Sequence, residues 1–334
     1  MQQYSKLGEW LDRLNAKNVI SIERPYPIET LKGDASCRRY YRLNTAENSY
    51  ILVASPTEKI TNAIFIERAE EWLRGGINVP EVYSADAING LMLIEDFGNT
   101  HLYDLLSKSQ DEQLYHLAID QLLNIQQLNA DHLVVFDRGF LLREMLLFDT
   151  WFIKYLLKIK APKMLEDVFG LLIESALGQP QVTMHRDYHS RNILMSNDKL
   201  AVIDFQDAVL GPIAYDLASL LRDCYLTLED QQLDQLIDYY LEHHNAKSQL
   251  SKPVEKVQFV RWFDLIGMQR HLKVLGLFVR LGVEEKKTAY LQEIPRVFDY
   301  LLGIAQKYPE LEAFHQWLLQ EVAPNLSFQN WYRA

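Results

Sequence analysis

The stretch of sequence that decides the fold is residues 185–207, HRDYHSRNILMSNDKLAVIDFQD. Asp187 stands five residues before Asn192, and Asp204 follows twelve residues after Asn192. Between these two residues, apolar runs at 193–195 and 200–203 flank the turn-forming residues 196–199, which predicts a β-hairpin. A hairpin brings its two ends together. We therefore expect Asn192 to lie beside Asp204, with Asp187 on the loop that precedes the hairpin.

This arrangement suits the transfer of a phosphoryl group. Mg²⁺ prefers hard oxygen ligands, such as the side-chain amide oxygen of Asn192 and the carboxylate of Asp204. The reaction also needs a carboxylate that orients the attacking hydroxyl and accepts its proton, and Asp187 is the candidate for that role. His185 and Arg186 are expected to position the loop rather than to react. The spacing matches the catalytic and metal-binding loops of kinases taken together.

Composition and charge exclude several classes of protein. The chain has 334 residues and a formal net charge of −11, whereas a general nucleic-acid binder needs a basic face. The two cysteines, Cys37 and Cys224, provide neither a disulfide framework nor a four-cysteine zinc site. The N-terminus has no apolar signal core, and no run approaches the roughly 18 apolar residues of a membrane span. We expect a cytoplasmic protein without nucleic-acid or membrane partners, and the sequence does not indicate its oligomeric state.

Hydrophobic periodicity divides the chain into two lobes. An amphipathic helix over 4–16 comes first. Short apolar runs then predict strands at 40–43, 50–53, 80–84 and 91–95, and a helix over 62–74 whose apolar residues Phe65, Ala69, Trp72 and Leu73 lie on one face. Beyond the hinge at 95–99, the expected elements are helices at 102–106, 113–128, 141–159 and 165–177, a β-rich island at 183–207, and helices from 215 to about 321. The predicted fold is α+β and bilobal, with a small sheet-plus-helix lobe over 1–97 and a larger helical lobe over 98–334.

The decisive stretch resembles the aminoglycoside-phosphotransferase branch of the protein-kinase-like fold, which shares the patterns H-x-D-x₄-N and I-D-F/W. The continuation AVLGPIAYDLA at 208–218 is also typical of that branch. This resemblance implies that ATP and Mg²⁺ are cofactors, that 1–97 binds the nucleotide, and that 98–334 carries the catalytic and substrate-binding residues. It further implies that Asp216 holds the catalytic loop by hydrogen bonds. The alternative for Asp216 is an ordinary acid at a helix N-terminus.

A narrower resemblance is to the bacterial kinases that phosphorylate N-acetylmuramate and N-acetylglucosamine at the anomeric C1 hydroxyl during peptidoglycan recycling. Three blocks carry it: GDASCRRYYR at 33–42, the catalytic blocks at 185–194 and 204–225, and FDLIGMQRHLKVLGLFVRL at 263–281. The implied activity is ATP-dependent phosphorylation of a small sugar. Two alternatives remain open. One is a kinase of another small alcohol, such as an aminoglycoside or a choline-like compound, and the other is an inactive nucleotide-binding module.

Residues 33–42 stand where kinases carry the glycine-rich loop over the nucleotide phosphates. With the hinge, the resemblance implies these nucleotide-binding residues: Gly33, Asp34, Ala35, Ser36, Arg38, Arg39, Glu95 and Phe97. One departure from the kinase pattern is clear, since the next strand, SYILVASP at 49–56, lacks the lysine that grips the phosphates. Phosphate anchoring is therefore expected from the loop, its arginines and the metal. The alternative for the two arginines is an ordinary exposed hairpin turn.

Three further residues are candidates for contact with the substrate. Asp207, three residues after Asp204, is expected to touch a second metal ion or the substrate, with a structural role as the alternative. Arg270 and Lys273 are three residues apart and share one helix face. Such a basic face suits the lactyl carboxylate of N-acetylmuramate. Solvated helix charges and internal ion pairs are the alternatives for these two residues.

Overall fold

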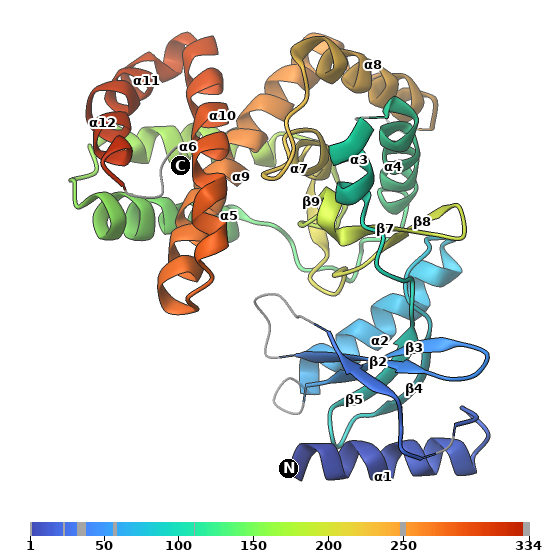
Figure 1. Cartoon of the computed structure of the whole chain (residues 1–334). Helices are drawn as coiled ribbons and strands as arrows, with labels where there is room; N and C mark the ends of the chain where they lie inside the picture. The colour runs from blue at the N-terminus through green and yellow to red at the C-terminus, as the bar shows by residue number, and fades with distance from the viewer. Residues whose placement is uncertain are drawn as a thin grey trace. The chain divides into compact units, whose positions relative to one another are not determined.

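The computed structural model of the chain describes residues 2–22, 24–31, 38–55, 59–109, 111–247 and 252–329. The chain divides into two compact units (Figure 1). The first unit comprises Met1–His101 together with Asn192–Gln206, and the second comprises Leu102–Arg191 together with Asp207–Ala334. The segment Asn192–Gln206, which contains the predicted hairpin, thus belongs to the first unit. The predicted boundary after residue 97 instead places this segment in the second lobe. The nucleotide-binding and catalytic roles of the two lobes stay predictions.

The first unit contains a five-stranded antiparallel sheet in the order β1-β2-β3-β5-β4. Its strands are β1 (Ile28–Thr30), β2 (Arg39–Asn44), β3 (Ser49–Ala54), β4 (Val82–Asp86) and β5 (Leu91–Glu95). The strands predicted at 40–43, 50–53 and 91–95 are confirmed. The one predicted at 80–84 begins two residues late, at Val82. Pro80 has no N–H group to donate to a strand ladder.

Two helices cover the opposite faces of this sheet (Figure 1). Helix α1 (Gln2–Ala16) buries apolar residues, including Leu7 and Trp10, against strand residues such as Leu52 and Leu93. Helix α2 (Lys59–Arg74) buries Trp72 completely but leaves Leu73 36% exposed. Leu73 therefore lies at the edge of the apolar face, because consecutive residues on a helix point about 100° apart.

The second unit is mostly helical. Its helices include α3 (Leu102–Ser109), α4 (Glu112–Ile125), α5 (Arg138–Leu147), α6 (Met164–Leu177), α7 (Tyr215–Leu221), α8 (Asp230–Lys247), α9 (Lys256–Glu284), α10 (Ile294–Lys307), α11 (Glu312–Trp317) and α12 (Ala323–Ser327). A two-stranded antiparallel ladder joins β6 (Gln181–Met184) to β9 (Val209–Pro212). Instead of one α-helix over 141–159, α5 ends at Leu147 and a π-helical segment, Phe148–Leu157, continues it. Among the described residues, no helix is long and apolar enough to cross a lipid bilayer.

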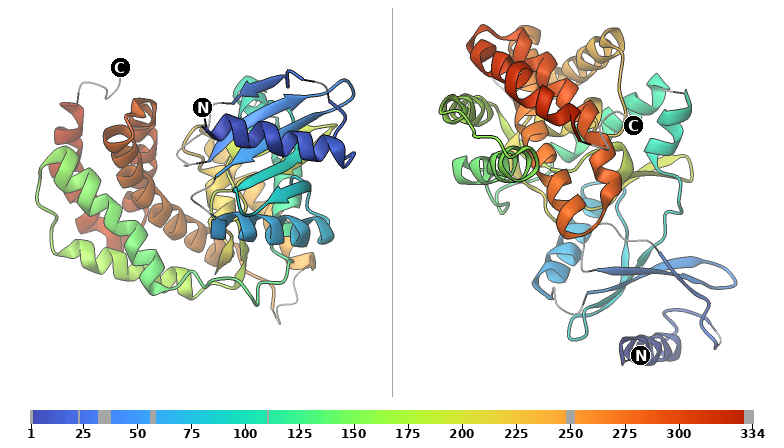
Figure 2. Two further views of the ribbon diagram at one scale, coloured as in Figure 1. Left: turned by 90° about the horizontal axis from the view of Figure 1, so that it is seen from below. Right: turned by 60° about the vertical axis from the view of Figure 1, so that its left-hand side comes forward.

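Helix α9 is the central element of the second unit, since it packs against α5, α6, α7 and α10. Figure 2 shows α5 and α6 running side by side in the same unit. Gly276 allows α9 to approach α5 closely, because a Cβ atom at this position would lie 2.2 Å from the carbonyl of Leu147. One turn before Gly276, α9 carries Lys273, and one turn before Leu147, α5 carries Glu144. The close contact therefore holds two charged residues of neighbouring helices near each other.

Candidate active site

The predicted hairpin is present in the first unit and consists of β7 (Ile193–Ser196) and β8 (Lys199–Val202). Asn197 and Asp198 at its tip both have positive φ, the backbone of a two-residue turn that matches the strand twist. At the open end, the N–H of Ile203 donates to the carbonyl of Asn192 at 3.0 Å. This bond continues the pairing beyond Val202, so Asn192 lies beside Ile203, the residue before Asp204, at the open end of the hairpin.

Asp204 occupies an unusual backbone conformation directly after this hairpin. Its φ of 64° lies in the left-handed region, which is rare for a residue other than glycine and common at functional sites. The next residue, Phe205, is fully buried and packs on Phe65 and Trp72 of α2. The side chain of Gln206 donates to the Asp204 carboxylate at 2.6 Å. The exposed carboxylate of Asp204 is therefore held in place by its two following neighbours.

The donor atoms on this hairpin fit magnesium. An amide oxygen at Asn192 and a carboxylate at Asp204 are hard ligands, and Mg²⁺ sites commonly use one or two carboxylates together with substrate phosphates. Across the described part of the chain, no group of three or more His, Cys, Asp or Glu side chains could hold a metal ion. An all-protein cage of the kind that zinc prefers is thus missing from those residues, whereas a Mg²⁺–nucleotide site does not need one. The assignment of Asn192 and Asp204 as ligands stays a prediction.

The loop predicted to be catalytic, which carries His185, Arg186 and Asp187, lies in the second unit and is held by Asp216 at the start of α7. One carboxylate oxygen of Asp216 accepts the N–H of His185 at 2.6 Å, and the other accepts the N–H of Arg186 at 3.0 Å. This is the contact that the family resemblance implies. Arg186 has a φ of 79°, so the loop turns sharply just before Asp187. Burial raises the pKa of Asp216 to about 7, although the two N–H donors act in the opposite direction.

Asp187 lies in a strongly positive environment. Burial raises its pKa, but the charges of nearby groups, led by Lys273, outweigh that effect and hold the pKa well below its usual range. The Nζ atom of Lys273 lies 3.9 Å from the Asp187 carboxylate, whose side chain is still 39% exposed. Asp187 is thus ionised, partly open to solvent, and able to accept a hydrogen bond from a ligand hydroxyl.

The two basic residues predicted to meet the substrate are both buried in α9. Lys273 lies 3.2 Å from the carboxylate of Glu144 on α5, and Arg270 donates to the sulfur of Cys224 at 3.4 Å. The internal ion pair that the sequence left open for Lys273 is therefore present. A direct contact of Arg270 or Lys273 with the substrate stays a prediction. Asp207 is exposed, and its backbone carbonyl accepts from Arg186 at 3.4 Å.

Two acids beside the loop were given no role from the sequence. Glu144 accepts from Arg186 at 3.0 Å, and Asp223 accepts from both the N–H and the hydroxyl of Ser190, at 2.9 and 2.6 Å. The sequence does carry one sign that Glu144 has a role: it is the single acid within the apolar run FLLREMLLF at 140–148. An acid that is buried with such a run needs a partner. Neither acid belongs to the H-x-D-x₄-N pattern.

Comparison with known proteins agrees with this geometry. The sequence profile of the phosphotransferase enzyme family (APH) matches residues 27–250. The chain belongs to this phosphotransferase family. Its members are enzymes, so the chain is an enzyme that transfers a phosphoryl group, as predicted.

Curated relatives of this phosphotransferase cover nearly its whole length. A protein from Neisseria meningitidis is 33% identical over 332 residues, which is 96% of this chain and 97% of the relative. A protein from Pseudomonas aeruginosa is 32% identical over 92% of this chain and 94% of the relative. Both relatives are named N-acetylmuramate/N-acetylglucosamine kinase.

Solved structures confirm the predicted protein-kinase-like fold of this phosphotransferase. Ethanolamine kinase from Plasmodium vivax matches with a TM-score of 0.63 at 14% identity, over 89% of this chain and 86% of that one. Choline kinase from Streptococcus pneumoniae matches with a TM-score of 0.58 at 14% identity, over 89% and 99% of the two chains. The aminoglycoside phosphotransferase APH(2'')-Ib, solved with ADP bound, matches with a TM-score of 0.58 at 15% identity, over 86% and 96%. Family membership implies that this phosphotransferase uses ATP.

Only part of the predicted nucleotide site falls on described residues of this phosphotransferase. Gly33, Asp34, Ala35 and Ser36 lie outside them. Two arginines follow this stretch and differ in exposure, since Arg38 is 5% exposed and Arg39 is exposed. The guanidinium of Arg38 lies 5.7 Å from the ring of Phe65, whose ring contacts Phe205 next to Asp204.

The hinge residues have internal contacts. Phe97 packs on the hairpin residues Leu194 and Ala201, and Glu95 is partly buried, which raises its pKa. The carbonyl of Glu81 accepts from the N–H of Glu95 at 2.9 Å, so β5 remains paired at its last residue. Contact of Glu95 and Phe97 with a nucleotide stays a prediction.

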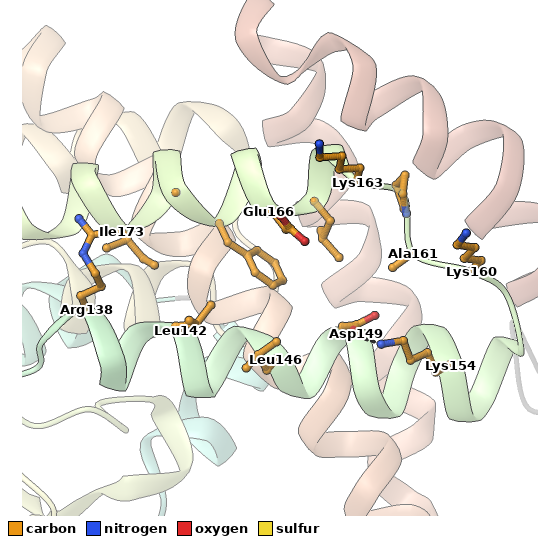
Figure 3. A pocket seen from close by; sticks show the side chains of 14 residues that line it. Arg138, Leu142, Leu146, Asp149, Lys154, Lys160, Ala161, Lys163, Glu166 and Ile173 are labelled. Atoms are coloured by element: carbon orange, nitrogen blue, oxygen red, sulfur yellow. Dashed lines mark hydrogen bonds and ion pairs between the residues drawn. The ribbon is translucent and has the colours of Figure 1, made fainter.

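A cavity of about 950 Å³ lies in the second unit between α5 with its π-helical continuation and α6 (Figure 3). Leu142 and Phe169 form part of its apolar lining, while Lys163 and Glu166 stand on its α6 side. None of the residues predicted for catalysis, metal binding or nucleotide binding lines it. The cavity is therefore separate from the residues predicted to carry out phosphoryl transfer.

Proposed function

We propose that this phosphotransferase is an ATP-dependent sugar kinase that transfers phosphate to the anomeric C1 hydroxyl of N-acetylmuramate and N-acetylglucosamine. The observation that carries the proposal is the near full-length similarity to relatives of that name, at 30–34% identity. Such a reaction suits the recycling of peptidoglycan sugars. It also suits a cytoplasmic enzyme, because ATP is the phosphate donor.

The proposal assigns a role to each residue of the motif. Asp187 orients the sugar hydroxyl and accepts its proton, while Asp216, through the N–H groups of His185 and Arg186, holds the loop that carries Asp187. The low pKa of Asp187 makes it a weak base. A weak base is adequate for this reaction, because the transition state of phosphoryl transfer is loose and an anomeric hydroxyl is more acidic than an ordinary alcohol.

Asn192 and Asp204 would hold Mg²⁺, which supplies positive charge for the phosphate oxygens when it is bound with the nucleotide. The backbone of residues 33–36, with Arg38 and Arg39, would bind the phosphates in place of the lysine that β3 lacks. Glu95 and Phe97 would border the adenine, and Asp207, Arg270 and Lys273 are the proposed residues on the substrate side.

The test is a comparison of acceptors. The full-length chain is incubated with Mg²⁺ and ATP, and ADP release is followed with N-acetylmuramate, N-acetylglucosamine and their C1 methyl glycosides. We expect both free sugars to react and both methyl glycosides to be inert, because the methyl group blocks the C1 oxygen. Equal rates with the methyl glycosides would mean that phosphate goes to another hydroxyl.

Two other outcomes would replace the proposal. ADP release with an aminoglycoside or choline, but with neither sugar, would identify a kinase of another small alcohol. Nucleotide binding without turnover on any acceptor would identify an inactive module.

A further inference from the structure

Glu144 lies at the centre of a buried cluster of charges beside the catalytic loop. One of its carboxylate oxygens accepts from Arg186 at 3.0 Å and lies 3.2 Å from the Nζ atom of Lys273. The other oxygen accepts from the side-chain amide of Gln269 at 3.2 Å. Arg186 belongs to the catalytic loop, and the other two residues belong to α9. A single carboxylate on α5 therefore joins the loop to the central helix.

Lys273 lies between two carboxylates at unequal distances. It is 3.2 Å from Glu144 and 3.9 Å from Asp187. The first distance is close to that of a hydrogen bond, whereas the second is too long for one and allows only attraction between the charges. The lysine thus favours the ionised form of Asp187 without donating directly to it.

Glu144 and Asp187 are negative, Arg186 and Lys273 are positive, and Arg270 adds a further positive charge that acts on Asp187. Taking the charge from Glu144 would leave Lys273 and Arg186 without their carboxylate partner. A buried cation without its partner is costly, so Lys273 would move into a direct hydrogen bond with Asp187. That bond would occupy an oxygen that the substrate hydroxyl needs and would weaken the base further.

Glu144 also contacts the loop directly, through the side chain of Arg186. The guanidinium of Arg186 lies over the ring of Phe140 at 4.8 Å and binds Glu144, while its backbone N–H is held by Asp216. Its φ of 79° is a conformation that the surrounding contacts must maintain. Glu144 fixes the side chain of this residue, and Asp216 fixes its backbone.

We infer that Glu144 is a positioning residue for phosphoryl transfer: by binding Lys273 and Arg186, it keeps Lys273 off Asp187 and leaves that carboxylate able to accept the proton of the substrate. The inference rests on the proposed role of Asp187 as the base.

The experiment compares Glu144→Gln, Lys273→Met and the double variant in the full-length chain, with Mg²⁺, ATP and N-acetylglucosamine. We expect Glu144→Gln to lower kcat by about 10–100-fold, as a small misplacement of a reacting group does, with little change in the KM for ATP. The double variant should have a higher kcat than Glu144→Gln alone, because the displaced lysine is gone. A purely structural role predicts the reverse, since two buried substitutions then add their losses.

The matched control is Glu174→Gln, which makes the same chemical change at an exposed acid on α6 that pairs with Arg138. Its kcat should equal that of the wild type, and thermal unfolding checks that every variant is folded. If Glu144→Gln is not recovered folded, the double variant is compared with Lys273→Met. Equal kcat values support the inference, and a further tenfold loss overturns it.

Two results overturn the inference directly: a Glu144→Gln variant with wild-type kcat, or a double variant slower than both single variants. Either would leave the proposed function intact, since the wild type would still phosphorylate its sugar. Conversely, a wild type that ignores both sugars refutes the proposed acceptors. The same series is then run with the acceptor that does release ADP, and the same two results decide.

Discussion

Replacing Gly276 with alanine should force apart the two helices that hold Glu144 and Lys273 together. The new Cβ would lie 2.2 Å from the carbonyl carbon and oxygen of Leu147 and 2.6 Å from the nitrogen of Phe148. Carbon atoms normally keep about 3.5 Å from such neighbours, so the helices must separate by about 1 Å. These neighbours are backbone atoms and cannot rotate away. We therefore expect a loss near the upper end of the usual overpacking cost, about 3 kcal/mol of unfolding free energy.

The same shift should lower activity, because a displacement of about 1 Å near a reacting group costs about 10²-fold in rate. Gly303→Ala on α10 is the matched control, since apart from the adjacent residues and backbone of its own helix nothing lies within 4 Å of its added Cβ. That variant should gain up to about 1 kcal/mol, the usual advantage of alanine over glycine in a helix. Urea unfolding followed by circular dichroism, together with kcat, measures both variants. A Gly276→Ala chain within about 0.5 kcal/mol of the wild type would refute the close packing of α9 on α5.

Four further predictions concern the site itself. Asp187→Asn should lower kcat by about 10²-fold or more while calorimetry shows nearly unchanged ADP affinity, and near wild-type turnover would exclude Asp187 as the base. Asp204→Ala should abolish activity and the strengthening of ADP binding by Mg²⁺, so an unchanged Mg²⁺ dependence would show that Asp204 is not a ligand. Arg38→Ala should weaken ADP binding by about 10-fold or more but leave adenosine binding unchanged, with Arg74→Ala at the exposed end of α2 as the control; equal losses for ADP and adenosine would indicate a structural role. The pKa of Asp216, raised by burial to about 7, means that the native state takes up a proton as pH falls through 7, whereas the unfolded chain stays ionised to about pH 4. As pH falls from 7 to 5, kcat should therefore fall. Over the same range the unfolding free energy of the wild type should rise relative to that of Asp216→Asn, because only the native wild type gains a proton. A kcat that stays constant between pH 7 and 5 would contradict this role of Asp216.

Local patterns predicted the hairpin and most strands correctly, because their signals lie within a few consecutive residues. The run LMLIE becomes β5 with the expected bounds, Leu91–Glu95. The turn residues Asn197 and Asp198 adopt the positive φ values that such a tip requires. The position of Asn192 beside Ile203, the residue before Asp204, follows from the hairpin register.

The supporting contacts of the catalytic loop could not be predicted in this way. Periodicity marks apolar faces of helices, and a charged residue within such a face carries no sign of its partner. Lys273 and Arg270 lie in the buried part of α9, and what permits the burial of Lys273 is Glu144 on a helix far away in the sequence. The change from α-helix to π-helix after Leu147 likewise has no local sequence signal that we can identify.

The division of the chain also affects the order in which the protein can fold during synthesis. The first unit requires Asn192–Gln206, because Phe205 fills the space between Phe65 and Trp72 of α2. That segment leaves the ribosome roughly a hundred residues after His101, which at about 5–20 residues per second is a delay of about 5–20 s. During this interval, α2 presents uncovered aromatic surface. We expect a nascent chain that ends shortly after His101 to be a substrate for chaperones. The first unit can become complete only after Leu102–Arg191 of the second unit have been synthesised.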